Sequence, residues 1–297
     1  MSTLSTTHDI RRRRTRDEVG QLEQQILAEL EQDHPQSIRH LFYRMTDPRL
    51  PEPVEKSDRG YRHVQHRVTD LRRRGLVAYG WISDATRRGF HTSTFTSPAE
   101  FLRSMAGLYR ADLWRDAGVY VEVWVESRSI AGIIVGECED LAVSLYPAGG
   151  FTSITLAYQA ADYINATTSN GAIPVQILYI GDYDPAGVLI DQSIERELRE
   201  HLHRDVSLTF HRIAITPSQI EDLDLPSKPR KAGDRRALHV RETVEAEAMP
   251  AHLMRALLRR EIEQFLPPQA LHVARVAEQS ERAYLDRLAD TLAGANP

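Results

Sequence analysis

Apolar residues in the first part of the chain recur at the spacing of helices. Between Asp17 and Gln32 they are Val19, Leu22, Ile26, Leu27 and Leu30. Between Ser37 and Met45 they are Ile38, Leu41, Phe42 and Met45. From about Ser57 to Arg74 they are Tyr61, Val64, Val68 and Leu71. Residues at such intervals gather on one side of a helix, so the pattern predicts three helices.

A fourth element follows the third helix. Gly75 is expected to end that helix, and the apolar run LVAYGWI at residues 76–82 predicts a strand. Three helices and then a strand is the order of a winged helix-turn-helix, although other three-helix bundles share it. We therefore expect a winged-helix DNA-binding domain over residues 17–116, after a flexible basic tail at residues 1–16.

The pattern changes after Asp116, where short apolar runs alternate with helical segments. The runs that predict strands are 119–125, 143–146, 175–180 and 208–215. Helical spacing lies between them, at 129–141, 153–165 and 185–201. This alternation indicates an α/β fold with a parallel sheet and right-handed crossovers. Residues 117–297 are expected to form this domain, with a C-terminal helical extension after residue 250.

Charge and cysteine content limit the kinds of site and the cellular compartment that the chain can have. The formal charge of the 297-residue chain is −5, with a basic excess before Asp116 and an acidic excess after it. Cys138 is the single cysteine, which excludes a disulfide within the chain and a cysteine-based zinc site. We expect a reducing, cytoplasmic setting. No apolar run approaches the roughly 20 residues of a membrane span, so no membrane segment is expected.

Carboxylates follow two of the predicted strands. Glu126 ends the first strand, and Asp182 and Asp184 follow the third. The carboxyl ends of parallel strands lie at one edge of a sheet, and residues two apart in an extended segment point the same way. Oxygen ligands favour Mg²⁺, with Mn²⁺ as the alternative. The spacing therefore predicts a metal site, unless the two aspartates only cap the helix that follows Pro185.

Three other acidic residues are weaker candidates. Glu122 lies on the same strand face as Glu126, but inside the strand and away from its carboxyl end. Glu245 and Glu247 either add charge near the metal or cap the following helix, and capping is the expected role.

The segments VYVEVWVES and GDYDPAG resemble the Toprim domain of topoisomerases, primases and related nucleases. The resemblance implies a Mg²⁺ site with Glu126 as ligand or acid/base, and with Asp182 and Asp184 as ligands. Ser127 departs from the family pattern, because a Lys or Gly commonly follows the glutamate. That departure affects the expected substrate contacts and leaves the expected metal ligands unchanged.

The segment SIRHLFYRM resembles the Arg-x-x-Tyr-Tyr segment of the topoisomerase VI A subunit and the related meiotic break-forming transesterase. In that family a winged-helix domain also precedes a Toprim domain. The resemblance implies that Tyr43 is the nucleophile and that Arg39 holds phosphate; Phe42 replaces the first tyrosine. Tyr43 and Arg39 are expected off the buried stripe of their helix. The alternative for Tyr43 is a half-buried tyrosine without catalytic function.

Four arginines on the third predicted helix are candidates for DNA backbone contacts: Arg62, Arg67, Arg72 and Arg73. Together these features predict a Mg²⁺-dependent, DNA-cleaving transesterase. The family resemblance implies a homodimer, and the missing ATP-binding P-loop motif implies that strand passage needs a separate ATPase B-type subunit. The alternatives are a Toprim nuclease that uses metal-activated water and a non-catalytic DNA-binding accessory protein.

Overall fold

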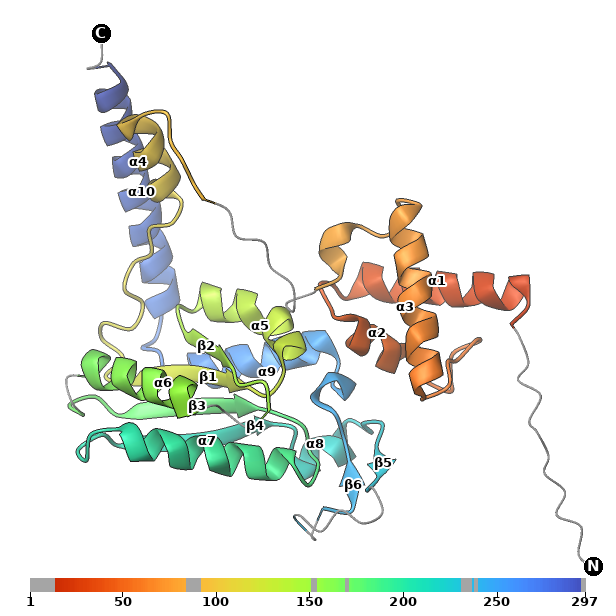
Figure 1. The fold of residues 1–297 in the computed structure, drawn as a ribbon. Helices are drawn as coiled ribbons and strands as arrows, with labels where there is room; N and C mark the ends of the chain where they lie inside the picture. Colours follow the sequence, from red (N-terminus) through yellow and green to blue (C-terminus); the bar gives the residue numbers. More distant parts are fainter. Residues whose placement is uncertain are drawn as a thin grey trace, which may run out of the picture. The chain divides into compact units, whose positions relative to one another are not determined.

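The computed structural model describes residues 14–83, 92–150, 154–168, 171–230, 237 and 240–294 (Figure 1). The chain divides into two compact units, residues 1–82 and 83–297. The hydrophobic pattern placed a domain boundary near residue 116, whereas the division between the two units falls after Ile82. Each unit is described by itself below.

The first unit contains the three predicted helices. They are α1 (Arg16–Gln32), α2 (Ile38–Met45) and α3 (Asp58–Arg73). Each helix begins at a hydroxyl residue whose side chain accepts a hydrogen bond from a backbone amide of the first turn; these caps are Thr15, Ser37 and Ser57. Leu22, Leu41 and Leu71 are fully buried, one from each helix, so the three apolar stripes form a common core.

The predicted strand at residues 76–82 is wrong. Tyr79–Trp81 form a 3-10 turn, and among residues 14–83 the only strand-like pairing is an isolated bridge between Gln36 and Ile82. Leu76 and Tyr79 are exposed, which shows that an apolar run does not become a strand when no neighbouring strand pairs with it. The described part of this unit is a three-helix arrangement, and the winged-helix interpretation is not confirmed.

The second unit contains the predicted parallel sheet. Its strands are β1 (Tyr120–Val125), β2 (Ser144–Pro147), β3 (Val175–Ile180) and β4 (Leu208–Ala214). They pair in the order β2-β1-β3-β4, all parallel. The connecting helices are α5 (Arg128–Asp140), α6 (Ile154–Thr167) and α7 (Gly187–His201). The mixed α/β prediction for this part of the chain is confirmed.

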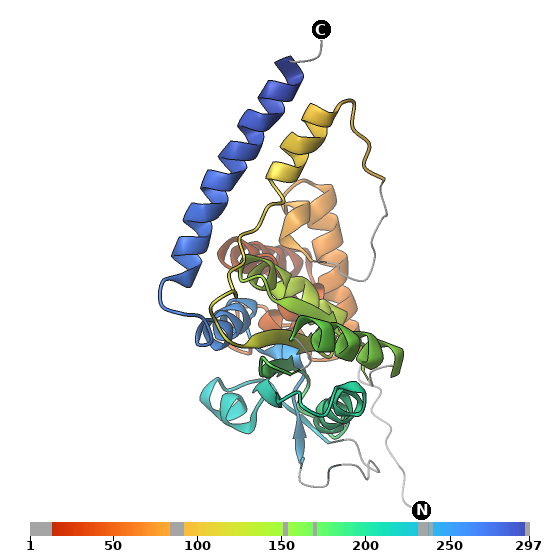
Figure 2. The ribbon, with the colours of Figure 1, turned by 90° about the vertical axis from the view of Figure 1, so that its left-hand side faces the viewer.

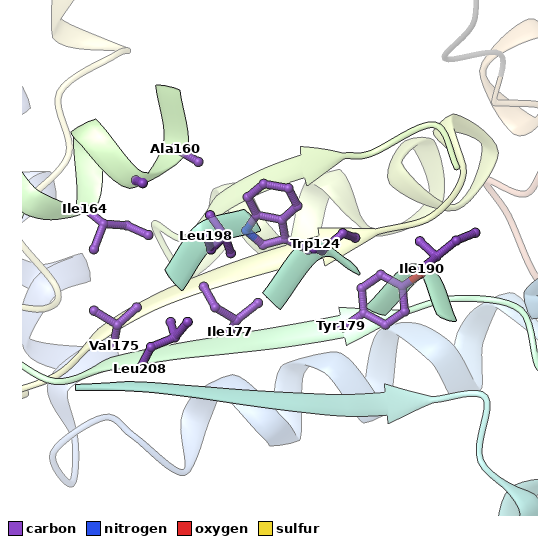
Figure 3. Packing of buried hydrophobic residues seen from close by; sticks show 11 residues of the cluster. Trp124, Ala160, Ile164, Val175, Ile177, Tyr179, Ile190, Leu198 and Leu208 are labelled. Atoms are coloured by element: carbon purple, nitrogen blue, oxygen red, sulfur yellow. The ribbon is translucent and has the colours of Figure 1, made fainter. Parts of the chain in front are cut away.

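The core of the sheet lies under α6 and α7 (Figure 3). Trp124 of β1 and Tyr179 of β3 are among its largest side chains, and both are fully buried. Ala160 and Ile164 reach this core from α6, and Ile190 from α7. Because β1 and β3 are covered on both faces, their sequences are mostly apolar, with one polar residue in each, and do not alternate with polar residues.

The remaining elements extend the second unit. They are α4 (Pro98–Ala106), α8 (Pro217–Asp222), β5 (Lys228–Pro229), β6 (Glu242–Thr243), the 3-10 turn Ala246–Ala248, α9 (Ala251–Glu263) and α10 (Ala270–Gly294). Helices α4 and α10 lie side by side and project from the sheet (Figures 1 and 2). None of the helices in the described ranges has the length and apolar character that crossing a membrane demands.

Candidate functional site

Two of the predicted metal ligands meet at the carboxyl edge of the sheet. Strands β1 and β3 are neighbours, so the residues that follow them are adjacent. Glu126 Oε2 accepts a hydrogen bond of 2.9 Å from the backbone amide of Asp182. Both side chains are half-buried. The strand ends therefore bring Glu126 and Asp182 together, as the spacing predicts.

Asp184 has a different environment. Its Oδ1 accepts hydrogen bonds from the amides of Ala186 (2.8 Å) and Gly187 (2.6 Å), at the start of α7. Asp182 Oδ1 instead accepts one of 2.8 Å from the amide of Ala246. The capping alternative thus describes Asp184 and does not describe Asp182. In the ranges that the structure describes, no three Asp, Glu, His or Cys side chains are grouped so that they enclose a metal ion.

Glu247 lies at this site, which was the less expected of the two roles that its sequence allowed. Its carboxylate is buried and accepts hydrogen bonds from the hydroxyls of Ser129 (2.5 Å) and Ser127 (3.4 Å). The expected role as a helix cap is wrong, because Pro250 precedes α9 and no side chain caps that helix. Glu247 is 120 residues from Ser127 in the sequence, and no local pattern reports a contact of that range.

A backbone bridge brings this segment to the strand ends. Tyr183 and Val244 exchange two hydrogen bonds, of 2.8 and 2.9 Å, in an isolated antiparallel bridge. Two residues after Val244, the backbone amide of Ala246 donates a hydrogen bond to the Asp182 carboxylate. Backbone pairing therefore positions Glu247 near Glu126 and Asp182. Backbone hydrogen bonds do not depend on which side chains are present, so the sequence pattern does not predict this contact.

The site concentrates negative charge. Burial, and then repulsion from Asp184 and Glu247, raise the pKa of Glu126, although the Asp182 amide opposes the shift. Burial and repulsion from Glu126 and Glu247 raise the pKa of Asp182 well above its ordinary value. Carboxylates held together against these costs form a site that favours a cation.

The donor set fits Mg²⁺ or Mn²⁺. Mg²⁺ is commonly bound by one or two carboxylates and completes its octahedral coordination with water and substrate phosphate oxygens. Glu126 and Asp182 provide such a pair of oxygen ligands. The same residues do not fit a metal that needs a complete cage of protein ligands, and Cys138 is buried inside α5.

Arg212 of β4 fixes the turn that carries the aspartates. Its guanidinium forms an ion pair of 2.7 Å with Asp191 and donates to the carbonyl oxygens of Gly181 (3.0 Å), Asp182 (3.2 Å) and Gly187 (2.7 Å). It also lies over the ring of Tyr179, 5.1 Å from the ring centroid. These contacts hold the backbone between β3 and α7 in one conformation, so Arg212 is a positioning residue for the site.

Glu122, the weaker candidate on β1, lies in the hydrophobic core. It is fully buried, and its two oxygens accept hydrogen bonds of 2.9 Å from the Tyr120 hydroxyl and the Trp124 indole. Burial raises the pKa of Glu122 to about 7, while the hydrogen bonds from Trp124 and Tyr120 lower it. Glu122 is thus a buried acid four residues before the site.

This raised pKa predicts a pH-dependent stability. The folded-state pKa of about 7 exceeds the ordinary value of 4.5, so between these values the unfolded chain loses the proton first. The contribution of Glu122 to the free energy of unfolding is therefore fully present below about pH 4.5 and is lost as the pH rises through about 7. The total loss is about 3 kcal/mol. In Glu122→Gln, urea unfolding at pH 5 and pH 8 is expected to differ correspondingly less than in the unaltered protein.

The control for this measurement is Glu139→Gln, an exposed position on α5. That variant should keep the pH dependence of the unaltered protein. An equal pH dependence in Glu122→Gln and Glu139→Gln contradicts the assignment to Glu122.

Tyr43 lies in the core of the first unit. It is 3% exposed, so the expectation that it lies off the buried side of α2 is wrong. The segment after α2 folds back over this helix, where Val54 is buried and Lys56 Nζ lies 5.3 Å from the centroid of the Tyr43 ring. Helical spacing alone does not reveal this cover. Arg39 is exposed, and its guanidinium lies 5.7 Å from the ring centroid of Tyr61.

The four predicted DNA-binding arginines differ in their environments. Arg62 and Arg73 are exposed. Arg67 forms an ion pair of 3.3 Å with Glu23 of α1, and both side chains are largely buried. Arg72 lies over the ring of Tyr79, 4.3 Å from its centroid. The exposed pair is suited to phosphate contacts, and Arg67 connects two helices of the unit.

No family model matches the chain, and neither a curated protein nor a solved structure matches it.

Proposed function

We propose that the chain is a Mg²⁺-dependent DNA-cleaving enzyme that binds the reacting phosphodiester at the edge of the sheet. The observation that carries this proposal is the pairing of Glu126 and Asp182 at neighbouring strand ends, where burial and repulsion from nearby carboxylates raise both pKa values. The resemblance of both strand ends to the Toprim pattern adds to it. Glu126 and Asp182 are the proposed ligands, and Mn²⁺ is an alternative to Mg²⁺.

A metal held by Glu126 and Asp182 would neutralise charge on the phosphodiester during attack and departure. Other residues of the chain position the proposed metal ligands. Arg212 fixes the turn that carries Asp182, and the Ala246 amide orients its carboxylate. Glu247 holds the hydroxyls of Ser127 and Ser129 at the start of α5.

The first candidate for the nucleophile is Tyr43. Its phenolic oxygen forms a bond to phosphorus, the bond from phosphorus to one deoxyribose oxygen breaks, and the phenolic proton leaves to a base. Arg39 lies one helical turn before Tyr43, and Lys56 Nζ lies over the Tyr43 ring, so both are candidate cations for this reaction. Since Tyr43 is 3% exposed, this mechanism requires that the ring becomes accessible when DNA binds.

Two partners belong to the Tyr43 mechanism. We propose a homodimer, in which the tyrosine of one protomer reaches the carboxylates of the other. Strand passage, if it follows cleavage, needs a separate ATPase subunit.

The second candidate for the nucleophile is water. The burial of Tyr43 favours it, because a nucleophile that is 3% exposed does not meet a phosphodiester without a conformational change. In this case Glu126 and Asp182 bind the metal as before, and Tyr43 is a core residue. The enzyme is then a nuclease that leaves free DNA ends.

Tyr43→Phe separates the two candidates, because it removes the hydroxyl and keeps the ring. In the transesterase mechanism, the variant is expected to lose cleavage of supercoiled plasmid by several orders of magnitude. The covalent protein–DNA adduct, detected after denaturation with and without protease digestion, should disappear with it. Tyr61→Phe, which removes the hydroxyl of a tyrosine packed against Phe42, is the control and should retain both.

Full cleavage by Tyr43→Phe, with free DNA ends and no adduct, assigns the reaction to water. Loss of cleavage on removal of the metal with EDTA is expected in both cases. Failure of the unaltered protein to bind or cleave DNA with Mg²⁺ or Mn²⁺ contradicts the proposed function.

A further inference from the structure

Tyr79 presents an open aromatic ring at the end of the basic helix α3. Its side chain is in the 3-10 turn Tyr79–Trp81, and the residue is 66% exposed. The guanidinium of Arg72 lies over one face of the ring, 4.3 Å from the centroid, and Arg72 Nη2 donates a hydrogen bond of 2.9 Å to the Tyr79 carbonyl. One face of the ring is therefore covered by a cation, while most of the residue meets solvent.

The turn that carries Tyr79 is fixed on both sides. Arg72 ties it to the last turn of α3. Trp81, two residues later, stacks on His34 with ring centroids 4.6 Å apart and an interplanar angle of 21°. The Gln36 amide donates a hydrogen bond of 3.1 Å to the Trp81 carbonyl. A large aromatic ring is thus exposed on a backbone held in place, which lowers the ordering cost of binding a flat ligand.

Exposed positive charge lies along α3, the helix to which Arg72 ties the Tyr79 turn. Arg62 and Arg73 are exposed and eleven residues apart on α3, which places them on the same helix face. Arg73 directly follows Arg72, the residue that lies over Tyr79. A nucleic acid backbone along this helix face has favourable contacts with both exposed arginines. Through its contacts with Arg72, the ring is fixed at the C-terminal end of the helix that carries these arginines.

We propose that Tyr79, backed by Arg72, is a stacking platform for an unpaired DNA base. A base in duplex DNA has both faces covered by its neighbours, whereas a base in single-stranded DNA offers an open face. Stacking on an aromatic side chain tolerates any base, and a guanidinium on the far side of the ring adds a cation–π contribution. The inference rests on the proposed DNA-cleaving function and adds to it a preference for locally unpaired DNA.

The test is a binding measurement without cleavage. The full chain, in EDTA, is titrated against a fluorescein-labelled thymidine oligonucleotide of about 12 nucleotides and against a duplex of the same length. Tyr79→Ala is expected to weaken single-strand binding by about 5- to 100-fold and to leave duplex binding nearly unchanged. Tyr79→Phe should bind like the unaltered protein, because the ring remains. Tyr158→Ala, which removes a 56% exposed tyrosine from the second unit, is the control and should change neither.

A spectroscopic signal supports the same assignment. In Tyr79→Trp, indole fluorescence is expected to be quenched on addition of the single strand more than in Tyr158→Trp. Unchanged single-strand binding by Tyr79→Ala overturns the stacking platform and leaves the proposed function standing. Equal losses for single strand and duplex also overturn it, since they indicate a structural role for Tyr79. Failure of the unaltered chain to bind the single strand in EDTA also overturns the stacking platform, whereas the proposed function is tested separately by binding and cleavage with Mg²⁺ or Mn²⁺.

Discussion

Asp182→Asn is expected to abolish metal-dependent cleavage and, at the same time, to stabilise the metal-free protein. The activity loss should be at least about 100-fold, because even the outer hydrogen-bond partners of metal ligands are worth about 10- to 100-fold. The stability gain follows from the charge that is removed. Asp182 is crowded by Glu126 and Glu247, and an asparagine Oδ1 still accepts the hydrogen bond from the Ala246 amide. A gain of about 0.5–2 kcal/mol is typical of such relief.

Thermal unfolding at pH 8 measures this prediction, in EDTA and again with Mg²⁺. Added Mg²⁺ should raise the Tm of the unaltered protein and should raise that of Asp182→Asn much less, because ligand stabilisation follows affinity for the folded state. Asp184→Ala is the contrasting variant: it also removes a negative charge, but it deletes the acceptor of the Ala186 and Gly187 amides at the start of α7 and should lose about 1 kcal/mol. A Tm of metal-free Asp182→Asn below that of the unaltered protein contradicts the inference that repulsion between the carboxylates destabilises the fold.

Arg212→Met is expected to cause the largest loss of stability, about 3–5 kcal/mol in the free energy of unfolding. The substitution leaves Asp191 as an uncompensated, largely buried charge, and it deprives the carbonyls of Gly181, Asp182 and Gly187 of a donor. Breaking a buried pair by removing one partner has a cost of this order. Methionine keeps the apolar part of the side chain, so the loss reports the guanidinium contacts.

Urea unfolding measures the effect, with Arg196→Met as the control. Arg196 is exposed on α7 and forms its ion pair with Glu197 at the surface, where such pairs contribute about 0–1 kcal/mol. Asp191→Asn combined with Arg212→Met should recover part of the loss, because the stranded charge is gone. A loss below about 1 kcal/mol in Arg212→Met disproves its role in holding the turn after β3.

The sheet was predictable because its information is local. The predicted runs at 119–125 and 175–180 match Tyr120–Val125 and Val175–Ile180 closely. Strands covered on both faces are mostly apolar and do not alternate with polar residues; β1 has one polar residue, Glu122, and β3 has one, Gln176. Polar segments separate these strands from the elements that follow. The meeting of Glu126 and Asp182 then follows from parallel pairing of neighbouring strands, without any knowledge of their side-chain contacts.

The wrong predictions have a common physical origin. Each depends on whether another segment packs against the element, and the hydrophobic pattern of one element does not contain that information. The apolar run at residues 76–82 lacks a pairing strand and forms a turn. Tyr43 was expected on an accessible face, but the segment carrying Val54 and Lys56 covers that side of α2. Glu247 reaches the site through the backbone bridge between Tyr183 and Val244.

The bridge between Tyr183 and Val244 also sets the order in which the site is completed during synthesis. When all four strands have been synthesised, the segment with Ala246 and Glu247 has not. The Ala246 amide therefore cannot yet bind Asp182, and the Glu247 carboxylate cannot yet accept hydrogen bonds from Ser127 and Ser129. The segment that completes the carboxylate cluster is thus translated some 30 residues after β4 ends at Ala214. A nascent chain or a fragment that ends before Val244 therefore carries the sheet without the finished carboxylate cluster.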